Sequence, residues 1–186
     1  IVGIGEDGLD GLGAEARRAI DQAEVLVGGE RHLAKVPDSP DSQAEKVSWG
    51  RKFGQGVEAI QAFEGKRVVI LASGDPMHYG AGSALAKRFG IAAMTIIPAP
   101  GAFSLAAARM GWSLPDVTCL TVHGRPLETV NLYLRPGARL LILSWDGATP
   151  AKLAALLVEK GYPDSHMTVL EHMGGDNENA IEATAE

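Results

Sequence analysis

Several features are scarce in this sequence, and each scarcity excludes a class of protein. The single cysteine, Cys119, excludes an internal disulfide and fits a reducing cytoplasm. Lys and Arg number 17 against 23 Asp and Glu, a formal net charge of −6 that argues against a general nucleic-acid binder. Aromatic residues make up 5%, so the chain has no stacking platform for single-stranded nucleic acid. These absences favour chemistry on a small molecule.

Two further absences concern membranes and metals. No apolar run approaches the ~18 residues that a membrane-spanning helix needs. The five His and one Cys show no spacing typical of metal ligands. We therefore expect neither a membrane nor a metal among the partners of this chain.

What the sequence does have is a regular alternation of short apolar runs with helical patterns. Such an alternation predicts βαβ units and mostly parallel sheets. We expect an N-terminal α/β domain over residues 1–112 and a C-terminal α/β domain over 113–186, joined near 112–116. The tail from Gly174 shows no clear final strand, so we expect the second domain to be truncated at its end. The expected strands cover 1–4, 25–27, 67–72, 94–97, 117–122, 138–143 and 167–170, and the expected helices 14–23, 57–63, 81–89, 103–110, 127–134 and 151–160.

The most informative segment is Ser73-Gly74-Asp75-Pro76, which directly follows an apolar strand-like run. In open α/β sheets, ligands bind just outside the carboxyl ends of the strands. Here Gly74 allows a ligand to approach the backbone, Pro76 fixes the turn and Asp75 adds a carboxylate. Gly, Asp and Pro are also ordinary turn residues, so a plain strand-to-helix turn is an equally valid interpretation of this segment alone.

Similar Gly-marked strand ends recur along the chain. Gly3-Ile4-Gly5-Glu6-Asp7-Gly8 lacks the Gly-x-Gly-x-x-Gly spacing of a dinucleotide site, and its acidic pair would repel a pyrophosphate. Pro100-Gly101 opens a helix, and His123-Gly124-Arg125-Pro126 ends the expected strand 117–122. Together these segments could line one ligand site.

This ordered set resembles the tetrapyrrole (corrin/porphyrin) methylase family. Gly3-Ile4-Gly5, Ser73-Gly74-Asp75-Pro76 with Gly80, Pro100-Gly101 and Glu171 follow the order and spacing of that family over essentially the whole chain. The resemblance implies a two-domain α/β fold with S-adenosylmethionine bound in the cleft between the domains, S-adenosylhomocysteine as the product, and usually a homodimer.

Two more segments resemble one branch of that family. Val27–Leu33 (Val-Gly-Gly-Glu-Arg-His-Leu) and His123-Gly124-Arg125-Pro126 look like the branch that methylates the C-5 meso position of a precorrin macrocycle in cobalamin biosynthesis. That branch implies a polycarboxylate tetrapyrrole as substrate and a further methyltransferase/decarboxylase domain in the full-length protein.

The resemblance also implies roles for particular residues. The expected donor-binding residues are Gly5, Gly74, Asp75, Met77, Gly80, Phe103, Ser104, Ser144, Trp145 and His172. The expected substrate-binding residues are Arg31, His32, His123 and Arg125, since Arg suits bidentate carboxylate contacts. No general base is identified, although His78, His123 and Glu171 could move a proton.

Two other functions stay open at this level. The same fold could methylate another acceptor, such as a ribosomal RNA ribose or a diphthine-type residue. Alternatively, the chain could be a non-catalytic module of a larger enzyme. Labelled-methyl transfer by the isolated chain would separate these possibilities.

Overall fold

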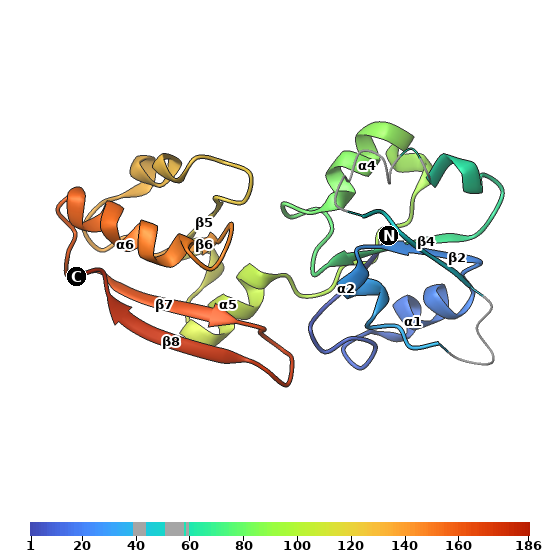
Figure 1. Cartoon of the computed structure of the whole chain (residues 1–186), viewed down its shortest axis with the longest axis horizontal. Helices are drawn as coiled ribbons and strands as arrows, with labels where there is room; N and C mark the ends of the chain where they lie inside the picture. The colour runs from blue at the N-terminus through green and yellow to red at the C-terminus, as the bar shows by residue number, and fades with distance from the viewer. Residues whose placement is uncertain (39–43, 51–57, 59) are drawn as a thin grey trace. The chain divides into compact units, whose positions relative to one another are not determined.

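The computed structural model describes residues 1–38, 44–50, 58 and 60–186. The contacts divide the chain into two units, Ile1–Gly101 and Ala102–Glu186 (Figure 1). The division precedes the helix at 102–110, which the sequence prediction had assigned to the N-terminal domain. Each unit is an α/β structure, which confirms the predicted fold class.

The first unit is built on a four-stranded parallel sheet in the order β1-β4-β2-β3. Its strands are β1 (Val2–Ile4), β2 (Val25–Gly28), β3 (Glu45–Ser48) and β4 (Val68–Ser73). Its helices are α1 (Ala14–Asp21), α2 (Glu30–Leu33) and α4 (Ala81–Phe89), with short 3-10 turns η1 (Gln61–Phe63) and η2 (Ile91–Ala93). The carboxyl ends of all four strands therefore lie at one edge of the sheet, which is the edge where α/β folds bind ligands.

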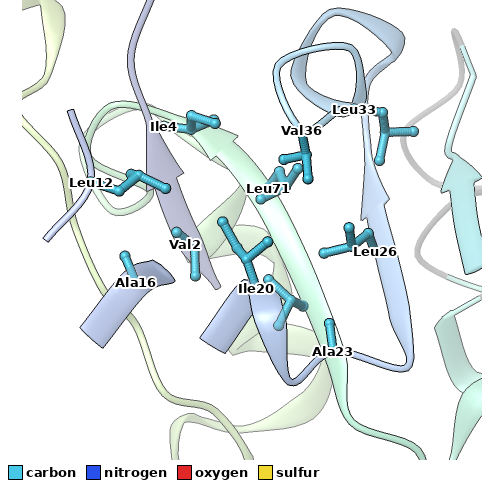
Figure 2. Packing of buried hydrophobic residues seen from close by; sticks show 11 residues of the cluster. Val2, Ile4, Leu12, Ala16, Ile20, Ala23, Leu26, Leu33, Val36 and Leu71 are labelled. Atoms are coloured by element: carbon cyan, nitrogen blue, oxygen red, sulfur yellow. The ribbon is translucent and has the colours of Figure 1, made fainter. Parts of the chain in front are cut away.

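Strands β1, β2 and β4 of this sheet are apolar on both faces because helices cover both. Leu26 and Leu71 point to the side of α1, where they join Val2, Ile4 and Ile20 (Figure 2). Their chain neighbours Val25, Val27 and Ile70 pack on the other side with Leu85 of α4. This alternation follows from the two-residue period of a strand, and a sheet buried on both faces needs such continuous apolar runs.

The second unit holds two separate pairs of strands. β5 (Thr118–Thr121) and β6 (Leu140–Leu143) are parallel, whereas β7 (His166–Glu171) and β8 (Asn179–Thr184) form an antiparallel hairpin. Around them lie α5 (Ala102–Met110), α6 (Thr149–Glu159) and the 3-10 segments η3 (Leu114–Asp116) and η4 (Leu127–Tyr133). Phe103 and Ala107 of α5 pack on Leu141 of β6.

One ion pair fastens the turn of the hairpin to α5. Arg109 donates from Nε and Nη2 to the two carboxylate oxygens of Glu178, at 2.6 and 2.7 Å. Gly174 N donates to the same carboxylate at 2.6 Å. The hydrogen bond from Arg109 is the main cause that lowers the pKa of Glu178 to about 2.

Several sequence predictions differ from the structure. The expected strand 94–97 is reduced to one parallel bridge between Ile97 and Val2. The helical segment expected over 127–134 is found as a 3-10 helix over Leu127–Tyr133. The tail, for which no strand was expected, contains β8. Of the expected helix 57–63, residues 57 and 59 lie outside the described part of the chain, and residues 61–63 form a 3-10 turn.

Neither a metal centre nor a membrane span is found in the described ranges. Within residues 1–38, 44–50, 58 and 60–186, no three His, Cys, Asp or Glu side chains gather in a way that could hold a metal ion. In the same ranges no helix combines the length and the apolar character that crossing a bilayer requires.

Candidate functional site

Three glycines hold the backbone together at the carboxyl edge of the first sheet. A Cβ on Gly3 would lie 1.9 Å from the carbonyl oxygen of Gly74 and 2.6 Å from the nitrogen of Ala99. Gly74 itself has a φ of +52°, and a Cβ there would lie 2.7 Å from the Cα of Gly101. Only glycine fits such approaches without displacing backbone. The Gly74 and Pro100-Gly101 segments singled out in the sequence are therefore in direct contact.

The turn after β4 is fixed by its own hydrogen bonds. Asp75 Oδ1 accepts a hydrogen bond from Met77 N at 2.8 Å, and the carbonyl of buried Pro76 accepts one from Gly82 N at 2.8 Å. A Cβ on Gly80 would lie 2.6 Å from that Pro76 carbonyl oxygen. Met77 is exposed at the rim, where a ligand could reach it.

A second motif meets this turn through side chains. Arg31 Nη2 donates to Ser73 Oγ at 2.6 Å, and His32 Nε2 lies 2.9 Å from the same oxygen. Arg31 and His32 belong to α2, directly after β2, whereas Ser73 is the last residue of β4. Because β2 and β4 are paired and parallel, their carboxyl ends bring the two motifs together. We call Arg31, His32 and Ser73 the edge cluster.

The electrostatics of the edge cluster keep His32 neutral. Its pKa is lowered to about 4, first by burial and then by the positive charges of Arg31 and Lys35, while Glu6 acts in the opposite direction. Lys35 Nζ is paired with Glu6 Oε2 at 2.9 Å, which places the loop after β1 beside the cluster. At neutral pH His32 therefore has one protonated and one unprotonated ring nitrogen.

Gly5, which is expected to contact the methyl donor S-adenosylmethionine, is covered by its own loop. A Cβ at Gly5 would lie 2.4 Å from Asp7 Oδ1, so the Asp7 carboxylate occupies the space next to the Gly5 backbone. Gly8 N also donates to the Gly5 carbonyl at 3.3 Å. The acidic loop thus closes on itself in this structure.

In the second unit, a residue expected to bind the substrate stacks on a residue expected to bind the methyl donor. His123 follows β5 and Trp145 follows β6, and their ring centroids lie 5.1 Å apart with an interplanar angle of 28°. Trp145 is 56% exposed, so the pair presents an aromatic surface to solvent. Arg125 is exposed two residues after His123. This surface is suited to a flat ring system.

The loop that carries Trp145 is held by a buried threonine. Thr149 Oγ1 accepts hydrogen bonds from the backbone nitrogens of Trp145 and Asp146, at 3.2 and 3.1 Å. The same hydroxyl donates to Asp146 Oδ1 at 3.0 Å, and this hydrogen bond is the main cause that lowers the pKa of Asp146. The start of α6 is therefore a rigid support for Ser144 and Trp145.

A cavity of about 370 Å³ lies in the second unit, walled by α5, β6, α6 and β7. Phe103 and Ser144 line it, together with the buried Thr149. Ser104, Trp145 and His172 are not among the lining residues. Its volume falls within the ~300–1,000 Å³ typical of small-molecule sites. A mostly apolar wall with a few hydroxyl groups suits a ligand that combines a ring with polar substituents.

The candidate proton carriers are on separate elements. His78 follows β4 and stacks on Tyr79, whose φ is +55°, at a centroid distance of 5.1 Å. His123 is in the aromatic pair described above. Glu171, at the end of β7, accepts a hydrogen bond from Asn179 Nδ2 at 3.1 Å within the hairpin. His172 next to it has a φ of +49° and is exposed.

Sequence reasoning gave no role to two residues that organise these sites, Ser73 and Thr149. Ser73 was quoted in the Ser-Gly-Asp-Pro motif, and its position as the last residue of a buried strand was a usable signal. Thr149 is the first residue of α6 and not its N-cap, and its hydroxyl binds the preceding loop, a contact for which the sequence carries no signal.

Comparisons with known proteins agree with this architecture. The model of the family "Tetrapyrrole (Corrin/Porphyrin) Methylases" matches residues 1–186. A relative from Sinorhizobium sp, named precorrin-6Y C(5,15)-methyltransferase [decarboxylating], is 48% identical over 178 residues, which cover 96% of this chain and 43% of that protein. The chain thus spans less than half the length of that relative.

A shorter relative and a solved structure complete the comparison. The cobalt-precorrin-7 C(5)-methyltransferase of Salmonella typhimurium is 33% identical over 178 residues, covering 96% of this chain and 86% of that protein. The crystal structure of uroporphyrin-III C-methyl transferase from Thermus thermophilus, complexed with S-adenosylhomocysteine, matches with a TM-score of 0.73 and 22% identity. The match covers 100% of this chain and 87% of that one.

Proposed function

Because the chain belongs to the tetrapyrrole (corrin/porphyrin) methylase family, we propose that it transfers a methyl group from S-adenosylmethionine to C-5 of a precorrin macrocycle in cobalamin biosynthesis. The names of the Sinorhizobium and Salmonella relatives support this reaction. The length of the first relative supports a further methyltransferase/decarboxylase domain in the full-length protein. The homodimer and the cytoplasmic location remain predictions.

One observation carries the proposal most strongly. The two motifs that resemble the precorrin branch and the wider family, Val27–Leu33 and Ser73-Gly74-Asp75-Pro76, meet in the edge cluster through Ser73. Arg31 there has no ion-pair partner among the described residues. A guanidinium held in place by a hydroxyl is well suited to a carboxylate side arm of a tetrapyrrole.

The residues present also fit the methyl donor. The close glycine contacts pack the Gly74 turn against Gly101 and so fix the backbone at the carboxyl edge of the sheet, the edge where α/β folds bind ligands. The cavity lined by Phe103, Ser144 and Thr149 has the size and lining for the adenosine part of S-adenosylmethionine. When bound, S-adenosylmethionine would supply an electrophilic methyl group on a sulfonium sulfur.

The chain's own contribution is then mainly orientation. In the overall reaction a C–CH₃ bond forms at the acceptor carbon, the sulfur–methyl bond breaks, and the acceptor carbon loses one proton to solvent or a nearby base. Within the first unit, Arg31 and His32 would hold a carboxylate side arm of the macrocycle, and Asp75 would help fix the donor. Holding two reactants in line can contribute as much as ~7–11 kcal/mol to lowering a barrier. A partly reduced tetrapyrrole has a nucleophilic meso carbon, so no strong base is required.

Methyl transfer tests the proposal directly. The chain is incubated with precorrin-6Y or precorrin-7 and a donor carrying a labelled methyl group, and the label is followed into the macrocycle. We expect transfer of one methyl group per macrocycle, and we expect Asp75→Ala to slow it. Absence of label from both macrocycles, in a folded chain that binds the donor, would contradict the proposed acceptor.

A further inference from the structure

Tyr79 adopts a backbone conformation that tyrosine rarely takes. Its φ is +55°, in the left-handed region, where the Cβ of a side chain crowds the backbone and costs free energy. Burial of the ring does not explain the conformation, because Tyr79 is 46% exposed. Residues held in such conformations cluster at active sites and ligand contacts. The position of this ring therefore calls for an explanation.

The tight segment from Pro76 to Gly82 is the cause of the strain. The Pro76 carbonyl accepts a hydrogen bond from Gly82 N at 2.8 Å, so the segment closes on the first residues of α4. A Cβ on Gly80 or on Gly82 would lie 2.6 or 2.7 Å from the same carbonyl oxygen. Tyr79 lies within this closed segment and takes a positive φ, which glycine takes at no steric cost. The turn alone would accept glycine at position 79, so what tyrosine adds is its ring.

The ring of Tyr79 has a fixed support on one face. The His78 ring stacks on it, with centroids 5.1 Å apart and an interplanar angle of 27°. The exposed part of Tyr79 can receive a second flat ring in an offset stack. Met77, which is 45% exposed, adds apolar surface in the same turn. The turn after β4 thus presents an oriented aromatic surface to solvent.

This aromatic surface belongs to the same edge of the sheet as the edge cluster. Tyr79 lies in the segment after β4, and Arg31 lies in the segment after β2. These two strands are neighbours and parallel, so their carboxyl ends are roughly 5 Å apart. Ser73, the last residue of β4, also accepts the hydrogen bond from Arg31 at 2.6 Å. A large ligand whose carboxylate meets Arg31 would therefore extend over an edge that carries an exposed ring.

We propose that Tyr79 is a further substrate-binding residue, whose ring, backed by His78, stacks on the conjugated face of the tetrapyrrole while Arg31 binds a carboxylate side arm. This inference rests on the proposed function for its ligand. Stacking of flat rings is favourable, and a tyrosine ring loses little rotamer freedom on binding. The strained turn orients the ring before the ligand arrives, which lowers the cost of binding. The ring contact would favour a macrocycle over a small polycarboxylate.

Glycine at position 79 separates the ring from the turn. Tyr79→Gly removes the ring and accepts the positive φ without strain, so the turn should fold as before. Tyr79→Phe keeps the ring and removes only the hydroxyl. Tyr133→Ala removes a ring of similar exposure, 41%, from η4 of the second unit. Gly13→Ala is the control for a neutral change, because nothing lies within 4 Å of its Cβ position.

The experiment titrates the wild-type chain and the four variants with uroporphyrin, a water-soluble porphyrin with eight carboxylates, and with S-adenosylhomocysteine as the measure of donor binding. We expect Tyr79→Gly to bind uroporphyrin about tenfold more weakly than wild type, and the other variants to stay close to wild type. Donor binding and Tm should be similar in all five chains. In proton NMR spectra of the wild-type chain, the aromatic protons of Tyr79 should move upfield when uroporphyrin binds, because a stacked ring lies in the shielding region of the porphyrin ring current.

Three results would overturn the role of the ring itself. The first is equal uroporphyrin affinity in Tyr79→Gly and wild type, or Tyr79 protons that do not move. The second is a Tyr79→Gly variant that loses donor binding or has a much lower Tm, because the residue then supports the turn rather than the macrocycle. The third is a Tyr79→Phe variant as weak as Tyr79→Gly, which would assign the effect to the hydroxyl.

Two further results separate this inference from the function on which it rests. A wild-type chain that binds the donor but not uroporphyrin overturns the stacking role, while donor binding still supports a methyltransferase. A folded wild-type chain that binds neither ligand contradicts the proposed function as well.

Discussion

The two units present their candidate functional residues in different ways. In the first unit, Arg31, His32 and Ser73 hold one another by hydrogen bonds at the edge of a four-stranded sheet. In the second unit, His123 and Trp145 form an exposed stack. Its strands form two separate two-stranded sheets, and a cavity lies between strands β6 and β7 and helices α5 and α6. The first arrangement suits recognition of a charged group with fixed geometry, whereas the second suits recognition by shape and ring contact.

This difference has a physical origin in how each unit is buried. The first sheet is covered on both faces, so its strand ends are rigid and can support a small polar network. The second unit has no cluster as large as the main cluster of the first, and the turn of its hairpin is tied to α5 by the surface pair Arg109–Glu178. We therefore expect substitutions at the edge of the first unit to have the larger effects.

The largest effect is expected for Gly3→Ala. Its Cβ would lie 1.9 Å from a carbonyl oxygen of the Gly74 backbone, so the sheet edge must shift. We expect a loss of at least ~3 kcal/mol in the free energy of unfolding, measured by urea denaturation. Gly147→Ala in the second unit, with nothing within 4 Å, should change stability by less than ~0.5 kcal/mol. Similar effects of the two substitutions would contradict the close packing at the first edge.

Ser73→Ala should have the next largest effect. It removes the Ser73 hydroxyl from His32 Nε2 and from Arg31 Nη2, at a cost of ~1–3 kcal/mol in stability. Uroporphyrin affinity should also fall about tenfold, and Ser73→Thr should restore much of it. The same change after β6, Ser144→Ala, should leave stability nearly unchanged, because Ser144 lacks the side-chain hydrogen bonds that Ser73 makes with Arg31 and His32 in the described part of the chain. Uroporphyrin affinity that survives Ser73→Ala would show that the edge cluster does not position Arg31.

Acid should destabilise the two units in different pH ranges. The pKa of His32 is lowered from about 6.5 to about 4, so the unfolded chain binds the proton more tightly. The stability associated with neutral His32 is complete above pH 6.5 and is lost as pH falls toward 4. Glu178, whose pKa is lowered from 4.5 to about 2, loses its contribution between those values. The Glu178 effect should be small, since its carboxylate lies at the surface.

Thermal unfolding as a function of pH measures both ranges. His32→Gln should remove the pH dependence between 6.5 and 4, and Glu178→Gln that between 4.5 and 2. If His32→Gln leaves the upper range unchanged, His32 is not the group that titrates there.

The smallest effect is expected for Trp145→Ala. Because the stack with His123 is largely exposed, its loss should lower stability by at most ~1 kcal/mol. Binding of uroporphyrin should weaken a few-fold, with Trp145→Phe close to wild type. A larger loss of stability or of uroporphyrin affinity in Trp145→Ala than in Ser73→Ala would reverse the comparison between the two units.

The fold was predictable where apolar periodicity is strong. Helix α4 was expected over 81–89 and is found there, since its buried Leu85 and flanking glycines mark it clearly. Strand β3 was missed because Glu-Lys-Val-Ser is exposed and shows no apolar run, and its existence depends on pairing with β2. Strand β8 was missed for the same reason, since only pairing with β7 defines it.

The candidate site was predictable in its residues but less so in their contacts. The motifs indicated Arg31 and His32, but their shared partner Ser73 lies 42 and 41 residues away and is reached only through the parallel pairing of β2 and β4. The stack of His123 on Trp145 likewise depends on the pairing of β5 and β6. Gly5, which is expected to face a ligand, is covered by the Asp7 side chain. The spacing of residues in the sequence does not predict this local contact.

The most direct test of the whole account is a calorimetric titration of the 186-residue chain with S-adenosylhomocysteine. The account predicts saturable binding at one site per chain, weakened by Asp75→Ala and unaffected by Gly13→Ala. A folded chain that gives no saturable heat would contradict the claim that these two units form a methyltransferase.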